Sequence, residues 1–262
     1  MKKLFLYFRR ITKMSFLTWM QYPQDIFASG IGSVVYTFMQ LAFFYFLFTS
    51  GKNVLSGYTF QQFYTVFFIS QCSIALFFLY SWGNLQRLGK DIEQGNIDLQ
   101  LIKPFHTAII LQLPKLFVNS FMPMFFIQAV LVCLFFFIGI PKVSLWFFPF
   151  SFVLIISSWI LLHATYVICI SVLFYLKGFW GFYKTAGNFS DLVQYPKDLF
   201  PSWIGILFTF CIPYFMVSDP LYRVFKDELT LQYVFFYVLF YVCFLSISSL
   251  IWHFGLRRYE GG

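Results

Sequence analysis

The chain has 262 residues, of which 60% are hydrophobic, 25% are aromatic and only 11% carry a charge. Soluble domains carry a charge on about a quarter of their residues, so this composition excludes an ordinary soluble protein and indicates an integral membrane protein. Apolar runs such as residues 125–140 do not alternate apolar with polar side chains, as the strands of a membrane barrel do. The sequence therefore predicts an all-α membrane protein with spans of about 20 residues.

The formal net charge of +8 comes from basic residues in short segments beside apolar runs. This placement favours membrane lipid over nucleic acid as the partner of the positive charge. The cysteine and histidine residues are scattered along the chain without the spacing of metal ligands. We therefore expect no metal site, no bound cofactor and no catalytic residue in this chain.

Residues 1–25 predict an amphipathic helix in the plane of the inner membrane surface, separate from the membrane-spanning domain of residues 26–262. At about 100° per residue, apolar side chains gather on one face of this helix and cations on the other. The alternative is a disordered basic tail. The apolar residues are Leu4, Phe8, Ile11 and Trp19, and the cations are Lys2, Lys3, Arg9, Arg10 and Lys13.

Six spans are predicted in the rest of the chain. Five of them lie at about residues 26–49, 60–82, 116–140, 145–175 and 231–254. The remaining crossing, fifth in order, has two alternatives: residues 201–217, or residues 178–195 followed by a re-entrant hairpin over 196–219. Prolines argue against a single straight helix here. The candidate re-entrant residues are Pro196, Pro201, Trp203, Pro213 and Pro220.

The basic residues also predict the orientation. Under the first alternative, 14 Lys and Arg lie in segments assigned to the cytoplasm and 4 lie outside. Under the second, 12 lie inside, 5 lie outside and Lys184 is within the membrane. Cytoplasmic loops carry the excess of Lys and Arg, so both alternatives place both termini and residues 84–104 in the cytoplasm of a multi-pass protein of the cell membrane.

Residues 84–104, "NLQRLGKDIEQGNIDLQLIKP", form a polar passage between two apolar runs. Asn84 suits a helix N-cap, Leu88 and Ile92 share an apolar face with Leu85, and Gly95 suits a left-handed helix exit. A solvated loop is the alternative. A capped amphipathic helix favours a surface that docks something cytoplasmic.

Three stretches carry a family resemblance: "QGNIDLQLIKP", "YPKDLFPSWIGILFTFCIPYFMVSDP" and the closing "WHFGLRRYEGG". In their order and spacing, the chain resembles the permease subunits of type-2 ATP-binding-cassette (ABC) exporters. The resemblance implies a coupling helix, between spans two and three, that seats in an ATPase subunit. The implied ATPase contacts are Arg87, Leu88, Lys90, Asp91, Ile92, Glu93, Gly95, Asp98 and Pro104.

The resemblance also implies a re-entrant segment before the last span and a pathway formed by two permeases, either two copies or two paralogous chains. The sequence itself has no G-x-x-x-x-G-K-[ST] phosphate loop, because "GKNVLS" lacks the first glycine. ATP and Mg²⁺ are therefore expected on a partner ATPase subunit and not on this chain.

Polar residues within spans are costly and usually face a cavity or a partner. If residues 178–195 form the fifth crossing, the candidate residues of the translocation path are Tyr183, Lys184, Asn188 and Asp191. The alternative is that Lys184 lies in a cytoplasmic loop or extends to the lipid headgroups. Asn119 and Gln128 are expected to make hydrogen bonds between helices. The resulting hypothesis is a non-catalytic ABC exporter permease for an amphiphilic or hydrophobic substrate. The alternatives are an ion-coupled secondary transporter, which needs embedded carboxylates, and an intramembrane enzyme, which needs a His and Asp cluster.

Overall fold

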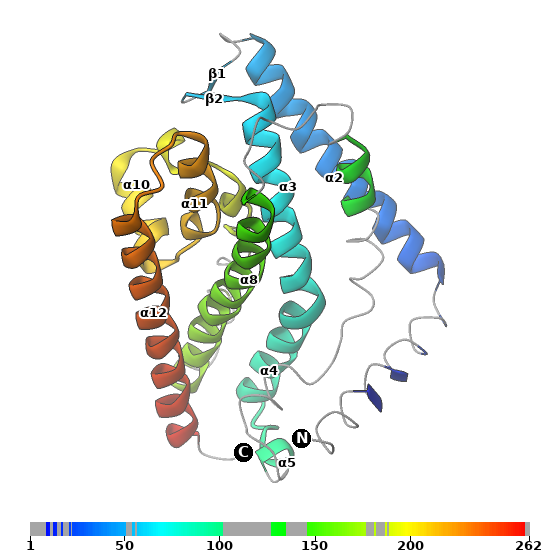
Figure 1. Ribbon diagram of the computed structural model, residues 1–262. Coiled ribbons are helices and arrows are strands. Elements are labelled where there is room, and N and C mark those ends of the chain that lie inside the picture. Colours follow the sequence, from blue (N-terminus) through cyan, green and yellow to red (C-terminus); the bar gives the residue numbers. More distant parts are fainter. Residues whose placement is uncertain are drawn as a thin grey trace.

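The computed structural model describes residues 9–10, 13–14, 17, 21, 23–50, 54–55, 57–101, 127–134, 146–176, 181, 187 and 189–259 (Figure 1). Four helices among these residues are long and apolar enough to cross a membrane, or five if one bent pair counts as a span. The all-α membrane class is thus confirmed. Most of the predicted interfacial helix lies outside the described residues, and so does the predicted third span apart from helical residues 127–134.

The first two spans are α2 (Pro23–Ser50) and α3 (Phe60–Phe77), as predicted. They are connected through a small antiparallel hairpin of β1 (Val54–Leu55) and β2 (Tyr58–Thr59). Gly57 in its turn has φ +86°, a conformation that glycine adopts without strain. Thr59 and Gln62 then form a capping box that starts α3. We call this end of the bundle the hairpin end.

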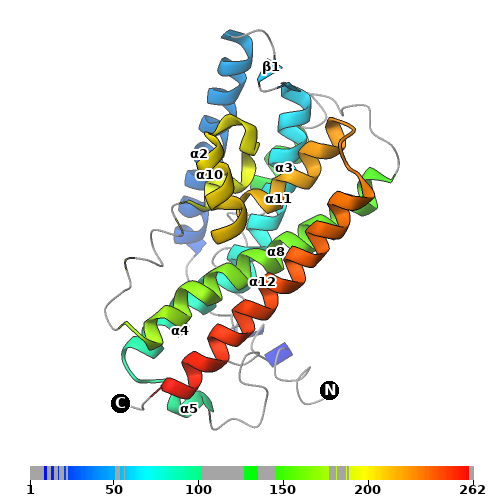
Figure 2. The ribbon, with the colours of Figure 1, turned by 90° about the vertical axis from the view of Figure 1, so that its left-hand side faces the viewer.

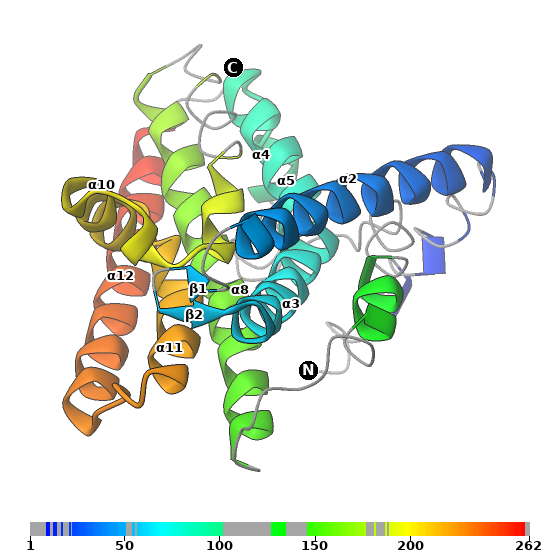
Figure 3. The same ribbon diagram turned by 90° about the horizontal axis from the view of Figure 1, so that it is seen from above.

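Two further long helices lie side by side through the bundle (Figure 2): α8 (Phe147–Ser171), extended by the 3₁₀ turn η3 (Val172–Phe174), and α12 (Leu231–Arg258). They confirm the predicted fourth and last spans. Seen from above, α2 and α12 lie on opposite sides, with α3 and α8 between them (Figure 3). Both outer helices present apolar side chains to the surroundings, including Phe38, Phe46, Phe235 and Leu239, as a lipid-facing surface requires.

The second span does not stop at the predicted polar passage. A π-helical turn, η1 (Phe78–Trp82), joins α3 to α4 (Gly83–Glu93), so that Phe60–Glu93 forms one helix of 34 residues. The prediction that Asn84 is an N-cap is therefore wrong. Its side chain instead donates to the Tyr80 carbonyl oxygen at 2.8 Å, because the helix is already formed before residue 84.

The wide turn η1 is fastened to α8 by hydrogen bonds. Trp159 Nε1 donates to Ser81 Oγ at 3.0 Å, and His163 Nδ1 lies 2.9 Å from the same oxygen. Ser81 is fully buried. A buried hydroxyl needs such partners, so this contact fixes α8 against the π turn.

The segment before α12 is a broken pair of helices. Ser202–Cys211, made of α10 (Ser202–Ile206) and the π turn η6 (Leu207–Cys211), meets α11 (Phe215–Phe225) at 117°. The two arms have 10 and 11 residues, or about 15 Å each, half of the hydrocarbon thickness. A single straight helix over residues 201–217 is therefore excluded, and the bent pair is either a broken span or a re-entrant hairpin.

Prolines explain the shape of this pair. Pro213 lies at the break, Pro201 immediately precedes α10 and Pro220 lies inside α11. The arms lie toward the hairpin end of the bundle (Figures 1 and 2), and their shape agrees with the re-entrant alternative. Before them come two 3₁₀ turns, η4 (Ser190–Gln194) and η5 (Lys197–Leu199), with Pro196 between them. Most of residues 178–188, the start of the alternative crossing, lie outside the described residues.

Buried side chains form one large cluster toward the hairpin end and another toward the opposite end. In the first, Ile127 and Leu131 of the short helix 127–134 join residues of α2 and α3. Cys72 Sγ donates to Gln128 Oε1 at 3.2 Å, which confirms the expected hydrogen bond of Gln128 between helices. Asn119 lies outside the described residues.

At the opposite end, α12 approaches η3 at a position where only glycine fits. A Cβ on Gly255 would lie 2.4 Å from Phe174 Cδ2. We expect Gly255→Ala to lower the free energy of unfolding by about 1–3 kcal/mol, because the Phe174 ring must shift. The measurement is thermal unfolding of the purified chain in detergent.

The matched control is Gly205→Ala, because nothing lies within 4 Å of the added methyl group. In a helix this control should be neutral or raise stability by up to about 1 kcal/mol. A Gly255→Ala variant as stable as the wild type would contradict this packing of α12 on η3.

Candidate functional site

The polar passage forms a sharp turn at the end opposite the hairpin. Here α4 ends at Glu93, and Gly95, which follows shortly after, has φ +75°. The amide of Asn96 donates to the Asp91 carbonyl oxygen at 2.8 Å, and that of Gly95 to the Ile92 carbonyl oxygen at 3.3 Å. This pair of hydrogen bonds is a Schellman motif, so the predicted left-handed exit at Gly95 is confirmed. A short helix, α5 (Asp98–Leu101), follows. We call this region the α4–α5 end (Figure 1).

The apolar face of α4 lies inside the protein's own core. Leu85, Leu88 and Ile92 are at most 5% exposed, and they belong to one buried cluster with Leu173 of η3 and Trp252 of α12. This corrects the expectation that Leu88 and Ile92 are presented to another subunit. Because α4 continues the second span, its apolar face continues the face by which that span packs on α8.

The charged side of α4 and the following turn remain accessible. Lys90 and Asp98 are exposed, and Arg87, Asp91 and Glu93 are partly exposed. These five residues carry charges of both signs, and the exposed amides of Gln94 and Asn96 lie among them. Such a mixed polar surface can make directional contacts with another protein. Pro104 lies outside the described residues.

A tyrosine connects the turn to the end of the last span. The amide of Ile97 donates to the Tyr259 hydroxyl at 3.4 Å, and the ring of Tyr259 lies edge-on to Phe174, with centroids 6.2 Å apart. Partial burial and the nearby charge of Asp98 raise the pKa of Tyr259, although the Ile97 hydrogen bond opposes the shift. The turn is thus attached to α12 as well as to α3. The sequence marked Tyr259 only as part of a terminal motif.

Of the four candidate path residues, only Asp191 is among the described residues. Its carboxylate accepts a hydrogen bond from the Tyr36 hydroxyl of α2 at 2.8 Å. Both residues line a cavity of about 370 Å³ whose wall includes Ser33, Thr37 and Gln71 together with apolar side chains. This polar cavity lies between α2, α3 and η4. Tyr183, Lys184 and Asn188 lie outside the described residues.

Ion pairs hold the broken helix pair at the hairpin end. Asp219 of α11 lies 3.1 Å from Lys197 and 2.9 Å from Arg223, and it accepts a hydrogen bond from Tyr233 of α12 at 2.7 Å. Only the four-residue spacing of Asp219 and Arg223 is a local signal of this cluster, because Lys197 and Tyr233 lie on other elements. It connects η5, α11 and α12, so it holds the broken helix pair against the last span.

A second ion pair attaches the same segment to the hairpin. Lys226 Nζ lies 2.8 Å from Asp198, which also accepts a hydrogen bond from Tyr58 of β2 at 3.4 Å. Partial burial alone would raise the pKa of Asp198, but the hydrogen bond and charge of Lys226 lower it below its usual value. The predicted re-entrant residue Trp203 projects from α10 and is 67% exposed.

Among the described residues, no group of three or more His, Cys, Asp or Glu side chains could hold a metal ion. A family model described as "ABC-2 family transporter protein" matches residues 34–262, which leaves out only the first 33 residues. The chain belongs to the ABC-2 transporter family. It is therefore a multi-pass permease-type membrane protein of an ABC transporter. Neither the curated proteins nor the solved structures contain a match to this chain.

The burial of Leu88 at the α4–α5 end can be tested by substitution. We expect Leu88→Asp to lower the free energy of unfolding by about 3–5 kcal/mol, because it places an unpaired charge in the core. Thermal unfolding in detergent measures this loss. Lys90→Asp, two residues away on the exposed side, should stay within about 0.5 kcal/mol of the wild type. Equal stability of the two variants would show that Leu88 is not buried.

Proposed function

We propose that this chain is the membrane-spanning permease subunit of an ABC exporter, driven by ATP hydrolysis on a separate nucleotide-binding subunit. The observation that carries the proposal is the single helix Phe60–Glu93, which ends in a charged turn beyond the bundle. With about 1.5 Å per residue, this helix is about 50 Å long. A continuous helix of this length, held to α8 at its π turn, can carry a displacement of the α4–α5 end into the membrane.

The nucleotide-binding subunit, with its ATP and Mg²⁺, would contact the accessible part of the predicted coupling segment. We assign this contact to Arg87, Lys90, Asp91, Glu93 and Asp98, with the turn at Gly95 holding them in place. Leu88 and Ile92 support the contact from the core side. Movement of the turn would reach α3 directly and α12 through Tyr259.

The translocation path would form between this chain and a second permease, either an identical copy or a paralogue. The polar cavity around Tyr36 and Asp191 supports this assignment, because it places a carboxylate and hydroxyl groups among apolar side chains. Such a lining suits an amphiphilic or hydrophobic substrate that carries a polar group. The substrate would leave the cytoplasm or the inner leaflet when the two permeases open toward the hairpin end.

The proposed orientation puts the α4–α5 end in the cytoplasm and the hairpin end outside, in the cell membrane. The excess of Lys and Arg in the segments that the sequence assigns to the cytoplasm, residues 84–104 among them, supports it. The ion pairs of Asp219 and Asp198 would then hold the re-entrant segment at the outer side.

The coupling contact can be tested by exchanging two exposed charges. We expect Lys90→Glu combined with Asp98→Lys to weaken binding of the nucleotide-binding subunit by about tenfold or more, because like charges then face each other. Co-purification of that subunit with the tagged chain, and ATP-driven export in proteoliposomes, measure the effect. Thermal unfolding of the permease should be unchanged.

The matched control is Glu228→Lys, an exposed charge reversal at the hairpin end, which should leave subunit binding intact. Unchanged binding and export in the exchange variant would refute the coupling contact. Export without any nucleotide-binding subunit would instead favour an ion-coupled secondary transporter.

The orientation can be tested by cysteine labelling. In a background whose five cysteines are replaced by alanine, we expect Trp203→Cys to react with a membrane-impermeant maleimide in intact cells. Lys90→Cys should react only after the membrane is permeabilised. The reverse pattern would invert the proposed topology, and protection of Trp203→Cys under both conditions would place α10 in mid-membrane.

A further inference from the structure

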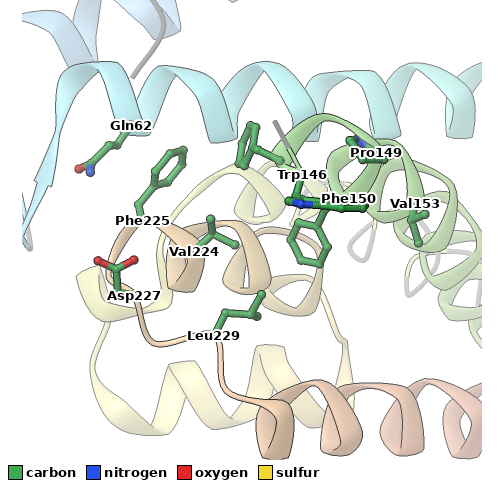
Figure 4. A pocket seen from close by; sticks show the side chains of 10 residues that line it. Gln62, Trp146, Pro149, Phe150, Val153, Val224, Phe225, Asp227 and Leu229 are labelled. Carbon is green, nitrogen blue, oxygen red and sulfur yellow. The ribbon is translucent and has the colours of Figure 1, made fainter. Parts of the chain in front are cut away.

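An apolar groove opens at the hairpin end, away from the polar cavity and from the α4–α5 end. It has a volume of about 680 Å³ and lies between the starts of α3 and α8, the end of α11 and the loop before α12. Figure 4 shows Asp227 and Gln62 on one side of this groove and Pro149, Phe150 and Val153 on the other. The groove therefore has a polar end and an apolar end.

The apolar end continues along the bundle. A second cavity of about 270 Å³ shares Phe150, Val153 and Leu229 with the groove and extends between α8 and α12 as far as Tyr241. From Tyr233 to Tyr241, α12 rises about 12 Å. The shared wall residues place the two cavities next to each other, so an extended alkyl chain can run from the groove into the space between α8 and α12.

The polar end carries one charged group. Asp227 lines the groove, and its carboxylate forms no salt bridge with any cation in the described part of the chain. The neighbouring cations are directed elsewhere: Arg223 pairs with Asp219 and Glu228, and Lys226 pairs with Asp198. The lining of the groove is thus negatively charged.

The backbone places this carboxylate at a position that usually holds glycine. Asp227 has φ +56°, and it follows α11 in a Schellman motif, in which the Glu228 amide donates to the Arg223 carbonyl oxygen at 3.0 Å. The motif fixes the backbone at Asp227 and therefore the direction of its Cα–Cβ bond. Trp146, 81% exposed, and Phe225 line the same groove, and aromatic faces attract alkylated ammonium groups.

We propose that this groove binds a single-chain amphiphile with a cationic headgroup, drawn from the surrounding membrane. Its ammonium group lies beside Asp227 and the aromatic rings, and its alkyl chain extends between α8 and α12. A phospholipid fits less well, because its phosphate would face Asp227 while Arg223 and Lys226 remain engaged with their own carboxylates. The proposal concerns binding alone and does not depend on the ATP-driven function.

The test uses the full chain in a neutral detergent and a dodecyl-trimethylammonium probe with a diazirine at the end of the alkyl chain. We expect cross-links, located by mass spectrometry, on α8 or α12 near Leu154 and Val238. Unlabelled dodecyl-trimethylammonium should compete with the probe, whereas dodecyl sulfate and dodecylphosphocholine should not. Equal competition by either of these two, or cross-links confined to other helices, would overturn the assignment.

Asp227→Asn removes the charge and keeps a side chain that tolerates the left-handed conformation. We expect it to weaken probe binding by about tenfold, as for the loss of one charged contact. Glu228→Gln removes the neighbouring charge outside the groove lining and should leave the affinity unchanged. Unchanged affinity of Asp227→Asn, or an equal loss in both variants, would overturn the role of Asp227.

Discussion

The structure depends on the packing of the apolar face of α4 against η3 and α12. Leu85, Leu88 and Ile92 lie in one buried cluster with Leu173 and Trp252, so the second, fourth and last spans meet at a single core next to the polar turn. This burial decides which side of α4 stays accessible, and it brings the turn within reach of Tyr259.

The irregular segment before α11 is stable because its carbonyl groups find partners inside the protein. The Tyr222 hydroxyl donates to the Gln194 carbonyl oxygen at 3.1 Å, and Ser218 Oγ donates to the Tyr195 carbonyl oxygen at 3.2 Å. Non-helical backbone at membrane depth persists only where protein or a wet cavity satisfies it. Side chains of α11 thus allow the chain to leave helical geometry at η4 without exposing polar groups to lipid.

Structural features that depend on local sequence pattern could be predicted from the sequence. Features that depend on contacts between residues far apart in the chain could not. Long apolar runs located α2, α3, α8 and α12, and Gly95 was recognised because a left-handed exit favours glycine. An apolar stripe on α4, however, looks the same whether it faces the protein core or another subunit, so the burial of Leu88 could not be predicted. The contact of Tyr36 with Asp191 joins residues 155 positions apart, and no local sequence pattern predicts a contact between such distant residues.

The π-helical turn η1 is a place where a long helix bends easily, because its hydrogen bonds span an extra residue. Without further contacts, this turn would bend when α4 is displaced, and the displacement would not reach α3. The buried oxygen of Ser81 contacts Trp159 and His163 of α8, and these contacts hold the π turn against α8. In the proposed transporter, a displacement of the α4–α5 end would therefore move α8 together with α3.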